Sequence, residues 1–189
     1  MGYEGRKGWK KLLQLNIQGV TKIFVWKTLN NCLPTKGNLF KRRVVDNPLC
    51  PICEKEFETS CHAIWSCPTA VDVWAEEGSL VKKWASSEVD IEIIWKNMVE
   101  RLIAEEMRLI AIVMRCIWLR RNKFVFEKGF TSPKDILIQA RHNVIDFQLP
   151  QTSKLESIKR QRRDMVRWKA PDKEIVKLNW DAAYDKTSQ

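Results

Sequence analysis

The sequence lacks an apolar run long enough to cross a lipid bilayer. Its longest apolar run, LIAIVMRCIWL at positions 109–119, is interrupted by Arg115, whereas a membrane-spanning helix needs about 20 apolar residues. The N-terminal stretch MGYEGRKGWKK has no apolar core, which excludes a secretory signal, and Arg6 stands where the myristoylation pattern requires serine or threonine. These absences predict an intracellular protein, nuclear or cytoplasmic, that is not secreted and has no membrane partner.

Acidic residues are scarce in two segments of the chain. Residues 1–49 carry ten lysines and arginines against two acidic residues, and residues 151–169 carry seven against two. Residues 50–150 carry thirteen against fifteen, and residues 170–189 carry three against four. The net charge of +10 is therefore concentrated in two basic segments around a nearly neutral middle. Such segments attract polyanions, nucleic acid first, although a solubilising surface is the simpler alternative.

Apolar and aromatic residues are plentiful. The chain of 189 residues is 44% hydrophobic and contains nine tryptophans, which is enough for a packed core and suits one domain or two small ones. In residues 20–31, the spacing predicts a helix with Val20, Ile23, Phe24 and either Lys27 or Thr28 on one face, toward the core. Pro34 ends that run, and Thr35 is expected to cap a short basic helix.

The second half of the chain also has helical periodicity. The pattern predicts a helix over residues 63–74 and a helical stretch from Ile91 to Lys128 that Gly129 ends. A further helix is expected to start at the sequence TSPKD, capped by Thr131 or Ser132, and to run to about Phe147 before Pro150. By contrast, EIVKLNWDAAY near the C-terminus alternates apolar and polar residues, which predicts a strand without a partner in this chain.

Four of the six cysteines lie in CPICEKEFETSCHAIWSC, residues 50–67. This stretch is compatible with a metal site, a disulfide pair or buried reduced thiols, and a reducing cell interior favours metal over disulfides. Cys50 and Cys53 form a C-x2-C turn, and a second pair of ligands must come from Cys61, His62 and Cys67. Neighbouring side chains point in different directions, so Cys61 and His62 are rivals for one position.

Three sulfurs and one imidazole would make a closed tetrahedral site. Soft sulfur ligands select zinc, and a site with four protein ligands leaves no position for a substrate water, so the predicted Zn²⁺ is structural. Little else in residues 47–68 could form a core, so loss of the ion is expected to unfold this stretch. The remaining cysteines, Cys32 and Cys116, lie in helical patterns and are expected in the core.

The run KIFVWKTLNNCLPTKGNLFKRR, followed by CPIC, an E-T pair, a histidine and CPTAVDVW, resembles a known family. It is similar to the zinc-binding region of plant non-LTR (LINE-type) retrotransposon reverse transcriptases, and IWLRRNKFVFE at residues 117–127 resembles the segment downstream. The resemblance implies His62, rather than Cys61, as the fourth ligand. The matching positions are Lys22, Phe24, Trp26, Leu33, Pro34, Thr35, Leu39, Arg42, Cys50, Cys53, Glu58, Thr59, His62, Cys67 and Trp74.

The C-terminal segment WKAPDKEIVKLNWDAAY is similar to the entry into a type-1 ribonuclease H domain. The resemblance places Asp181 at the position of the first catalytic carboxylate of that family. Ribonuclease H chemistry needs two metal ions held by several carboxylates, and this chain offers Asp181 and Asp185 there. Asp181 is therefore interpreted as a relic position, and no catalytic residue is expected.

Taken together, the sequence predicts a mainly α protein. We expect a small zinc-stabilised helical domain plus a helical hairpin, with a lone β-strand stub of a truncated ribonuclease H-like fold. The expected segments are a basic N-terminal segment (1–19), a reverse-transcriptase-type zinc-binding domain (20–80), a helical region (91–149), a basic linker (150–169) and the truncated start of a ribonuclease H-like domain (170–189).

The predicted function is a non-catalytic module that binds RNA or DNA mainly through phosphates. Two alternatives are a ribonuclease H acting on RNA–DNA hybrids and a structural connector in a retroelement polyprotein. The sequence leaves the oligomeric state open. The expected nucleic-acid contacts are Lys36, Lys41, Arg42, Arg43, Lys159, Arg160, Arg162, Arg163 and Arg167.

Overall fold

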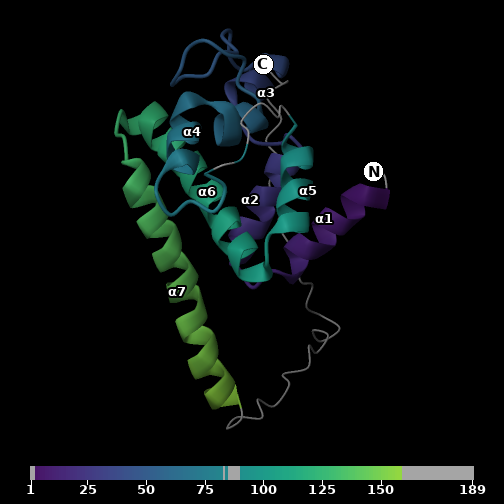
Figure 1. Cartoon of the computed structure of the whole chain (residues 1–189). Coiled ribbons are helices and arrows are strands. Elements are labelled where there is room, and N and C mark those ends of the chain that lie inside the picture. The colour runs from purple at the N-terminus through teal and green to yellow at the C-terminus, as the bar shows by residue number, and fades with distance from the viewer. Residues whose placement is uncertain (1–2, 83, 85–89, 159–189) are drawn as a thin grey trace, which may run out of the picture. The chain divides into compact units, whose positions relative to one another are not determined.

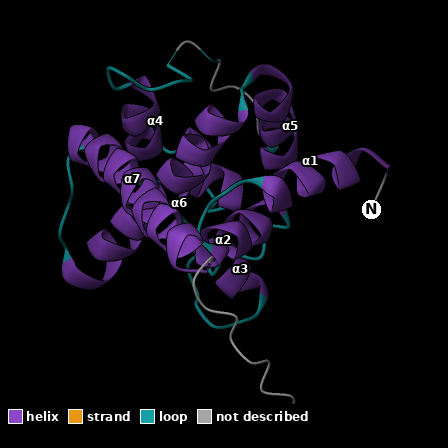
Figure 2. Cartoon of the chain, turned by 90° about the horizontal axis from the view of Figure 1, so that it is seen from below, coloured by secondary structure: helices purple, strands orange, loops and turns teal. Residues whose placement is uncertain are grey.

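The structure of the protein is a computed structural model that describes residues 3–82, 84 and 90–158. Its contacts divide the chain after Ser153, and all the elements below lie in the first unit except the end of the last helix. The expected C-terminal strand, Asp181 and the five basic residues from Lys159 to Arg167 lie outside the described residues. Within them, the fold is helical, and an isolated bridge between Leu49 and Phe57 is the sole β pairing (Figure 2).

Seven α-helices and one π-helix make up the described fold. Their bounds are α1 Tyr3–Gln14, α2 Gly19–Leu29, α3 Lys36–Lys41, the π-helix η1 His62–Ser66, α4 Pro68–Ala75, α5 Ile91–Arg101, α6 Ala104–Glu127 and α7 Pro133–Ile158. No described helix is long and apolar enough to span a lipid bilayer.

Helix α6 is the centre of this arrangement. It packs against α2 and η1, while α5 packs against α1 and α2 (Figure 1). Its buried residues lie around most of its circumference because other helices cover it on more than one side; they include Met107, Ile110, Val113 and Ile117. The segment of residues 50–67, which contains the cysteine cluster, therefore lies against α6. This helix begins 37 positions after Cys67.

The expected N-terminal caps of α3 and α7 are present. The Thr35 hydroxyl accepts a hydrogen bond from the Asn38 N–H at 3.2 Å, and the Ser132 hydroxyl accepts one from the Asp135 N–H at 3.1 Å. Each hydroxyl satisfies a backbone donor that has no partner inside its helix. Helix α7, however, does not end before Pro150 but continues to Ile158. A proline removes one helical hydrogen bond, and here it interrupts the ladder without ending the helix.

The buried face of α2 differs from the expected one. Phe24 and Thr28 are buried as expected, but Val20 and Ile23 are 51% and 58% exposed. Thr21 and Val25 take their places in the core. Helix α2 carries apolar residues on several sides, so periodicity could not select one face, and the position of α6 decided it.

Two stretches that were predicted as continuous helices are each interrupted in the structure. The stretch from Ile91 to Lys128 is broken at Leu102 and Ile103, where the Glu106 carboxylate accepts a hydrogen bond from the Ile103 N–H at 2.9 Å and caps the start of α6. The stretch 63–74 is broken at Cys67, which is extended at φ −58° and ψ 136°. Pro68 disfavours helical backbone in the residue before it, which explains this second break.

The two cysteines outside the cluster have different environments. Cys116 is buried in α6, as expected, but Cys32 is exposed and its thiol donates to the Asn30 carbonyl at 3.2 Å. Cys32 follows the end of α2 rather than lying within it, so helical periodicity did not apply there.

A buried ion pair joins α6 to the loop before η1. Glu58 has no exposed surface, and its two carboxylate oxygens accept from Nε and Nη2 of Arg121 at 2.9 and 2.7 Å. The same carboxylate accepts from the Lys36 backbone N–H at the start of α3. The Glu58 backbone N–H donates to the Pro48 carbonyl at 3.0 Å. Glu58 thus connects α3, the loop and α6.

We expect Arg121→Met to destabilise the protein by about 3–5 kcal/mol, because it leaves the Glu58 carboxylate buried without its counter-charge. Urea denaturation followed by circular dichroism measures the change. The double variant Glu58→Gln/Arg121→Met should lose less than the sum of the two single variants, since it removes both charges. Arg108→Met is the matched control on α6: the Arg108 side chain is only 13% exposed, but its partner Glu105 is 67% exposed and remains solvated when the arginine is removed, so this variant should lose less stability than Arg121→Met. Equal losses in Arg121→Met and Arg108→Met would contradict the assignment.

Candidate metal centre

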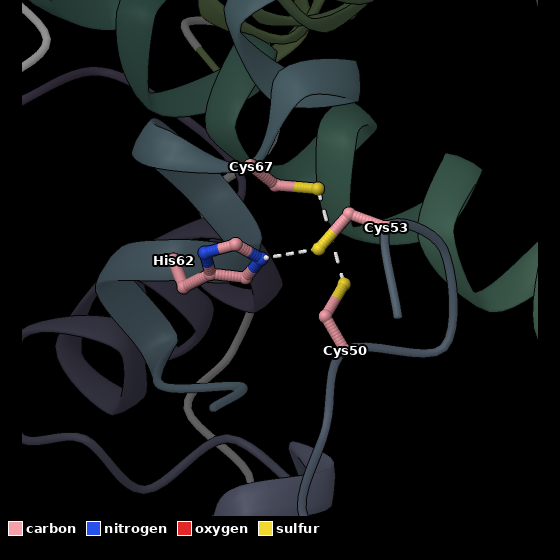
Figure 3. Close-up of side chains that lie close together, drawn as sticks. All are labelled: Cys50, Cys53, His62 and Cys67. Atoms are coloured by element: carbon pink, nitrogen blue, oxygen red, sulfur yellow. Dashed lines mark hydrogen bonds between the residues drawn. The ribbon is translucent and has the colours of Figure 1, made fainter. Parts of the chain in front are cut away.

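The first two cysteines of the cluster lie in a tight loop. The Cys50 N–H donates to the Glu56 carbonyl at 2.8 Å, the Glu54 N–H donates to the Cys50 carbonyl at 2.9 Å, and Glu54 has a left-handed backbone with φ 57°. These hydrogen bonds fold residues 50–56 back on themselves. The Cys50 and Cys53 sulfurs consequently point toward the same space (Figure 3).

The π-helix η1 brings His62 and Cys67 to that space. Residues five positions apart in an α-helix point about 140° away from each other, because each residue turns the chain by about 100°. Here the Cys67 N–H donates to the His62 carbonyl at 2.8 Å, which closes a wider turn of five residues. Thr59 precedes this π-helix, and its hydroxyl accepts from the His62 N–H at 2.9 Å. The sequence spacing H-x4-C thus acquires its geometry from a π-helix.

The four side chains converge from both elements. One ligand atom from each of Cys50, Cys53, His62 and Cys67 lies within 4.8 Å of the other three. Figure 3 shows the imidazole pointing toward the three sulfurs. Cys61 is buried but is not part of this group. The structure therefore brings together the four residues that the resemblance implied.

The separations within the group fit tetrahedral zinc. With Zn–S bonds of about 2.3 Å, tetrahedral angles place two sulfurs about 3.8 Å apart, and with Zn–N of about 2.0–2.1 Å a nitrogen lies about 3.5 Å from a sulfur. The Cys50 and Cys67 sulfurs are 3.8 Å apart, and His62 Nε2 lies 3.4 Å from the Cys53 sulfur. Three sulfurs and one imidazole are also the donor set of structural zinc sites.

Proton sharing within the group shifts the pKa values of its members in opposite directions. The Cys50 and Cys67 sulfurs share a hydrogen bond, which raises the pKa of Cys50 and lowers that of Cys67 to about 3. Burial raises the pKa of Cys53, but backbone N–H donors of Lys55 and Glu56 outweigh it, so the pKa is lowered. Burial likewise lowers the pKa of His62, yet the neighbouring Cys67 and Cys53 sulfurs raise it overall. A divalent cation would replace the shared protons, because metal ligands must be deprotonated.

The predicted nucleic-acid contacts that the structure describes lie next to this loop. Lys36 is half-buried at the first position of α3, and Lys41, Arg42 and Arg43 are exposed at its end. Helix α3 lies close to the metal loop because Gly37 has no side chain. A Cβ there would lie 2.3 Å from the Phe57 ring and 2.5 Å from the Glu58 carbonyl oxygen.

Two arginines of α6 were missed as part of this region. Arg121 pairs with Glu58, and Nη1 of Arg120 donates to the Thr69 carbonyl at 2.7 Å. Their signal in the sequence was the pair of adjacent arginines that follows the apolar residues IWL in the stretch IWLRRNKF. Two cations in a buried helix need partners, and those partners come from residues 58–69.

Comparison with known proteins supports the same region. Residues 3–74 match the family model described as zinc-binding in reverse transcriptase, which is less than half of the chain. The match begins in α1, includes the four clustered residues and ends in α4; α6 with Arg120 and Arg121 lies beyond it. No curated protein and no solved structure matches the chain.

We expect the purified protein to contain one zinc ion per chain, which elemental analysis measures. His62→Ala should lose the ion and unfold residues 47–68, because three remaining sulfurs leave the tetrahedron incomplete. Cys61→Ala is the matched control from the neighbouring position and should retain zinc. Loss of the ion from Cys61→Ala but not from His62→Ala would show that the other neighbour is the ligand.

Proposed function

We propose that this protein is a zinc-stabilised nucleic-acid-binding module of the reverse transcriptase type, derived from a plant LINE-type retrotransposon. Cys50, Cys53, His62 and Cys67 hold one structural Zn²⁺. The family match and the convergence of this donor set support the proposal. Four protein ligands complete a tetrahedral ion, so the zinc would hold the loop in shape rather than activate a water molecule. We therefore propose that this chain is not an enzyme.

The observation that carries the binding function is the attachment of α3 to the metal loop. The Lys36 N–H donates to the Glu58 carboxylate, and the Gly37 N–H donates to the Glu58 carbonyl at 3.2 Å. At the other end of α3, Nζ of Lys41 lies 5.7 Å from the centroid of the Phe57 ring. A folded metal loop therefore holds a basic helix in place.

The cations at the end of α3 are suited to phosphate groups. Lys41, Arg42 and Arg43 are consecutive and exposed, and Arg43 adopts a left-handed backbone with φ 58° that turns the chain after the helix. Within the described residues none of the three has a carboxylate partner within 4.0 Å. We propose that they contact the phosphates of RNA or DNA, with little selection among base sequences. We also assign Lys36, Lys159, Arg160, Arg162, Arg163 and Arg167 to this binding function.

We expect the protein to bind a single-stranded RNA or DNA oligonucleotide with an affinity that falls as salt rises, since each phosphate contact releases counterions. Replacing Lys41, Arg42 and Arg43 together by alanine should weaken binding at low salt and reduce the slope of log affinity against log salt by about two to three. Fluorescence anisotropy at several salt concentrations measures both quantities.

The control variant replaces three exposed lysines on other helices, Lys10, Lys27 and Lys134, and so removes the same charge. It should retain most of the affinity and the salt slope. If both triple variants bound the oligonucleotide equally weakly, the loss of affinity would come from net charge and not from contacts at the end of α3. An absence of binding at low salt would refute the proposed function.

A further inference from the structure

Arg120 is a buried cation without a close counter-ion. Its side chain lies in α6 and only 4% of the residue is exposed. Within the described part of the chain, no carboxylate lies within the 4.0 Å of an ion pair with Arg120, and its Nε has no hydrogen-bond partner. The guanidinium carbon lies 3.9 Å from the centroid of the Phe130 ring, which supplies a modest attraction. Burying an unpaired charge is costly, so a compensating negative charge is expected nearby.

The neighbouring arginine shows what compensation looks like in this helix. Arg121 forms a two-pronged ion pair with buried Glu58. Asp72 acts on Arg120 electrostatically, but it is exposed to water, which screens its charge. Arg121 thus has a buried carboxylate as its partner, whereas its neighbour Arg120 has the screened charge of Asp72.

The candidate metal centre lies next to Arg120. Nη1 of Arg120 donates to the Thr69 carbonyl at 2.7 Å, and the Thr69 hydroxyl lies 3.3 Å from the Cys67 sulfur. Burial lowers the pKa of Arg120, and the charges of Asp72 and Cys67 offset part of that effect. One residue, Thr69, therefore separates the guanidinium from a predicted metal ligand.

The net negative charge of the zinc complex, the ion with its four ligands, supplies the missing counter-ion. Three thiolates outweigh the two positive charges of Zn²⁺, so the complex with a neutral imidazole carries one net negative charge. Two of its sulfurs, on Cys50 and Cys67, belong to residues that are 1% exposed, which means that water offers this charge little stabilisation.

We propose that Arg120 is the counter-ion of the zinc complex and that Thr69 links it to Cys67 as a positioning residue. The inference rests on the proposed zinc site. Arg120 offsets the net negative charge of the ion with its four ligands, and the complex in turn allows Arg120 to remain charged in the core. The zinc-binding unit thus extends to α6, beyond the residues that match the family model.

The test compares three variants of the full 189-residue chain. Arg120→Met removes the charge and keeps much of the apolar stem, Arg120→Lys keeps a charge, and Arg108→Met is the control on the same helix. Competition with a chromophoric chelator measures zinc affinity. We expect Arg120→Met to bind zinc about 10–100-fold more weakly, the range for residues that support metal ligands. Arg120→Lys should recover most of that loss, and Arg108→Met should resemble the unmodified protein.

A second measurement separates electrostatics from packing. Without the nearby cation, a zinc-bound thiolate is more nucleophilic, so Cys67 in zinc-loaded Arg120→Met should be alkylated faster by iodoacetamide, as located by mass spectrometry. Arg120→Lys should be alkylated at close to the original rate. If Arg120 had only a packing role, the lysine and methionine variants would show the same loss of zinc affinity and the same alkylation rate.

Each outcome decides the proposal. The proposal would be overturned, with the zinc site left intact, if Arg120→Met changed neither the zinc affinity nor the alkylation rate. It would also be overturned if Arg120→Lys weakened zinc binding as much as Arg120→Met. Absence of zinc from the unmodified protein would overturn both the site and this inference. If Arg120→Met does not fold, Arg120→Lys decides by itself, because the proposal requires the charged variant to retain zinc.

Discussion

The buried contact between Glu58 and Arg121 is the constraint on which the rest of this structure depends. One fully buried carboxylate receives two N–H donors from α6 and one from the start of α3. These donors come from two different parts of the chain, and 63 positions separate Glu58 from Arg121. Moving two charges out of water is expensive, so the pair adds less to stability than its geometry suggests. Its geometry connects α3, the loop and α6 at one buried carboxylate.

The same principle organises the charges around the metal centre. Arg121 is compensated by a carboxylate of the protein, whereas Arg120 has no carboxylate within ion-pair distance among the described residues. The metal loop contributes Glu58 to one arginine and, on our proposal, the net charge of its zinc complex to the other. The negative charges of the loop and the positive charges of α6 thus compensate each other in the core. The basic end of α3 depends on this assembly, because its first turn is hydrogen-bonded to Glu58.

The candidate site was more predictable than the helices that surround it. Ligand spacing narrowed the metal donors to Cys50, Cys53, Cys67 and one of two neighbours, since a C-x2-C turn is a local feature. Local chemistry likewise predicted the caps by Thr35 and Ser132. The buried face of α2 was not predictable, because Val20 and Ile23 are as apolar as the residues that were buried. The break at Leu102 was not predicted, because apolar periodicity continues across it. The continuation of α7 through Pro150 was not predicted either, because a proline usually ends a helix.

The sequence by itself determined a helical protein with concentrated positive charge and a small set of candidate metal ligands, because residue type, spacing and capping act over a few positions. Spacing alone left Cys61 and His62 as rivals, the family resemblance implied His62, and the tertiary structure places His62 in the cluster. A π-helix closes between His62 and Cys67, and His62 rather than Cys61 lies with the three sulfurs. The tertiary structure also placed Arg120 and Arg121 of α6 against residues 58–69. Such long-range partners are chosen by packing and by the cost of burying charge, which no local pattern contains.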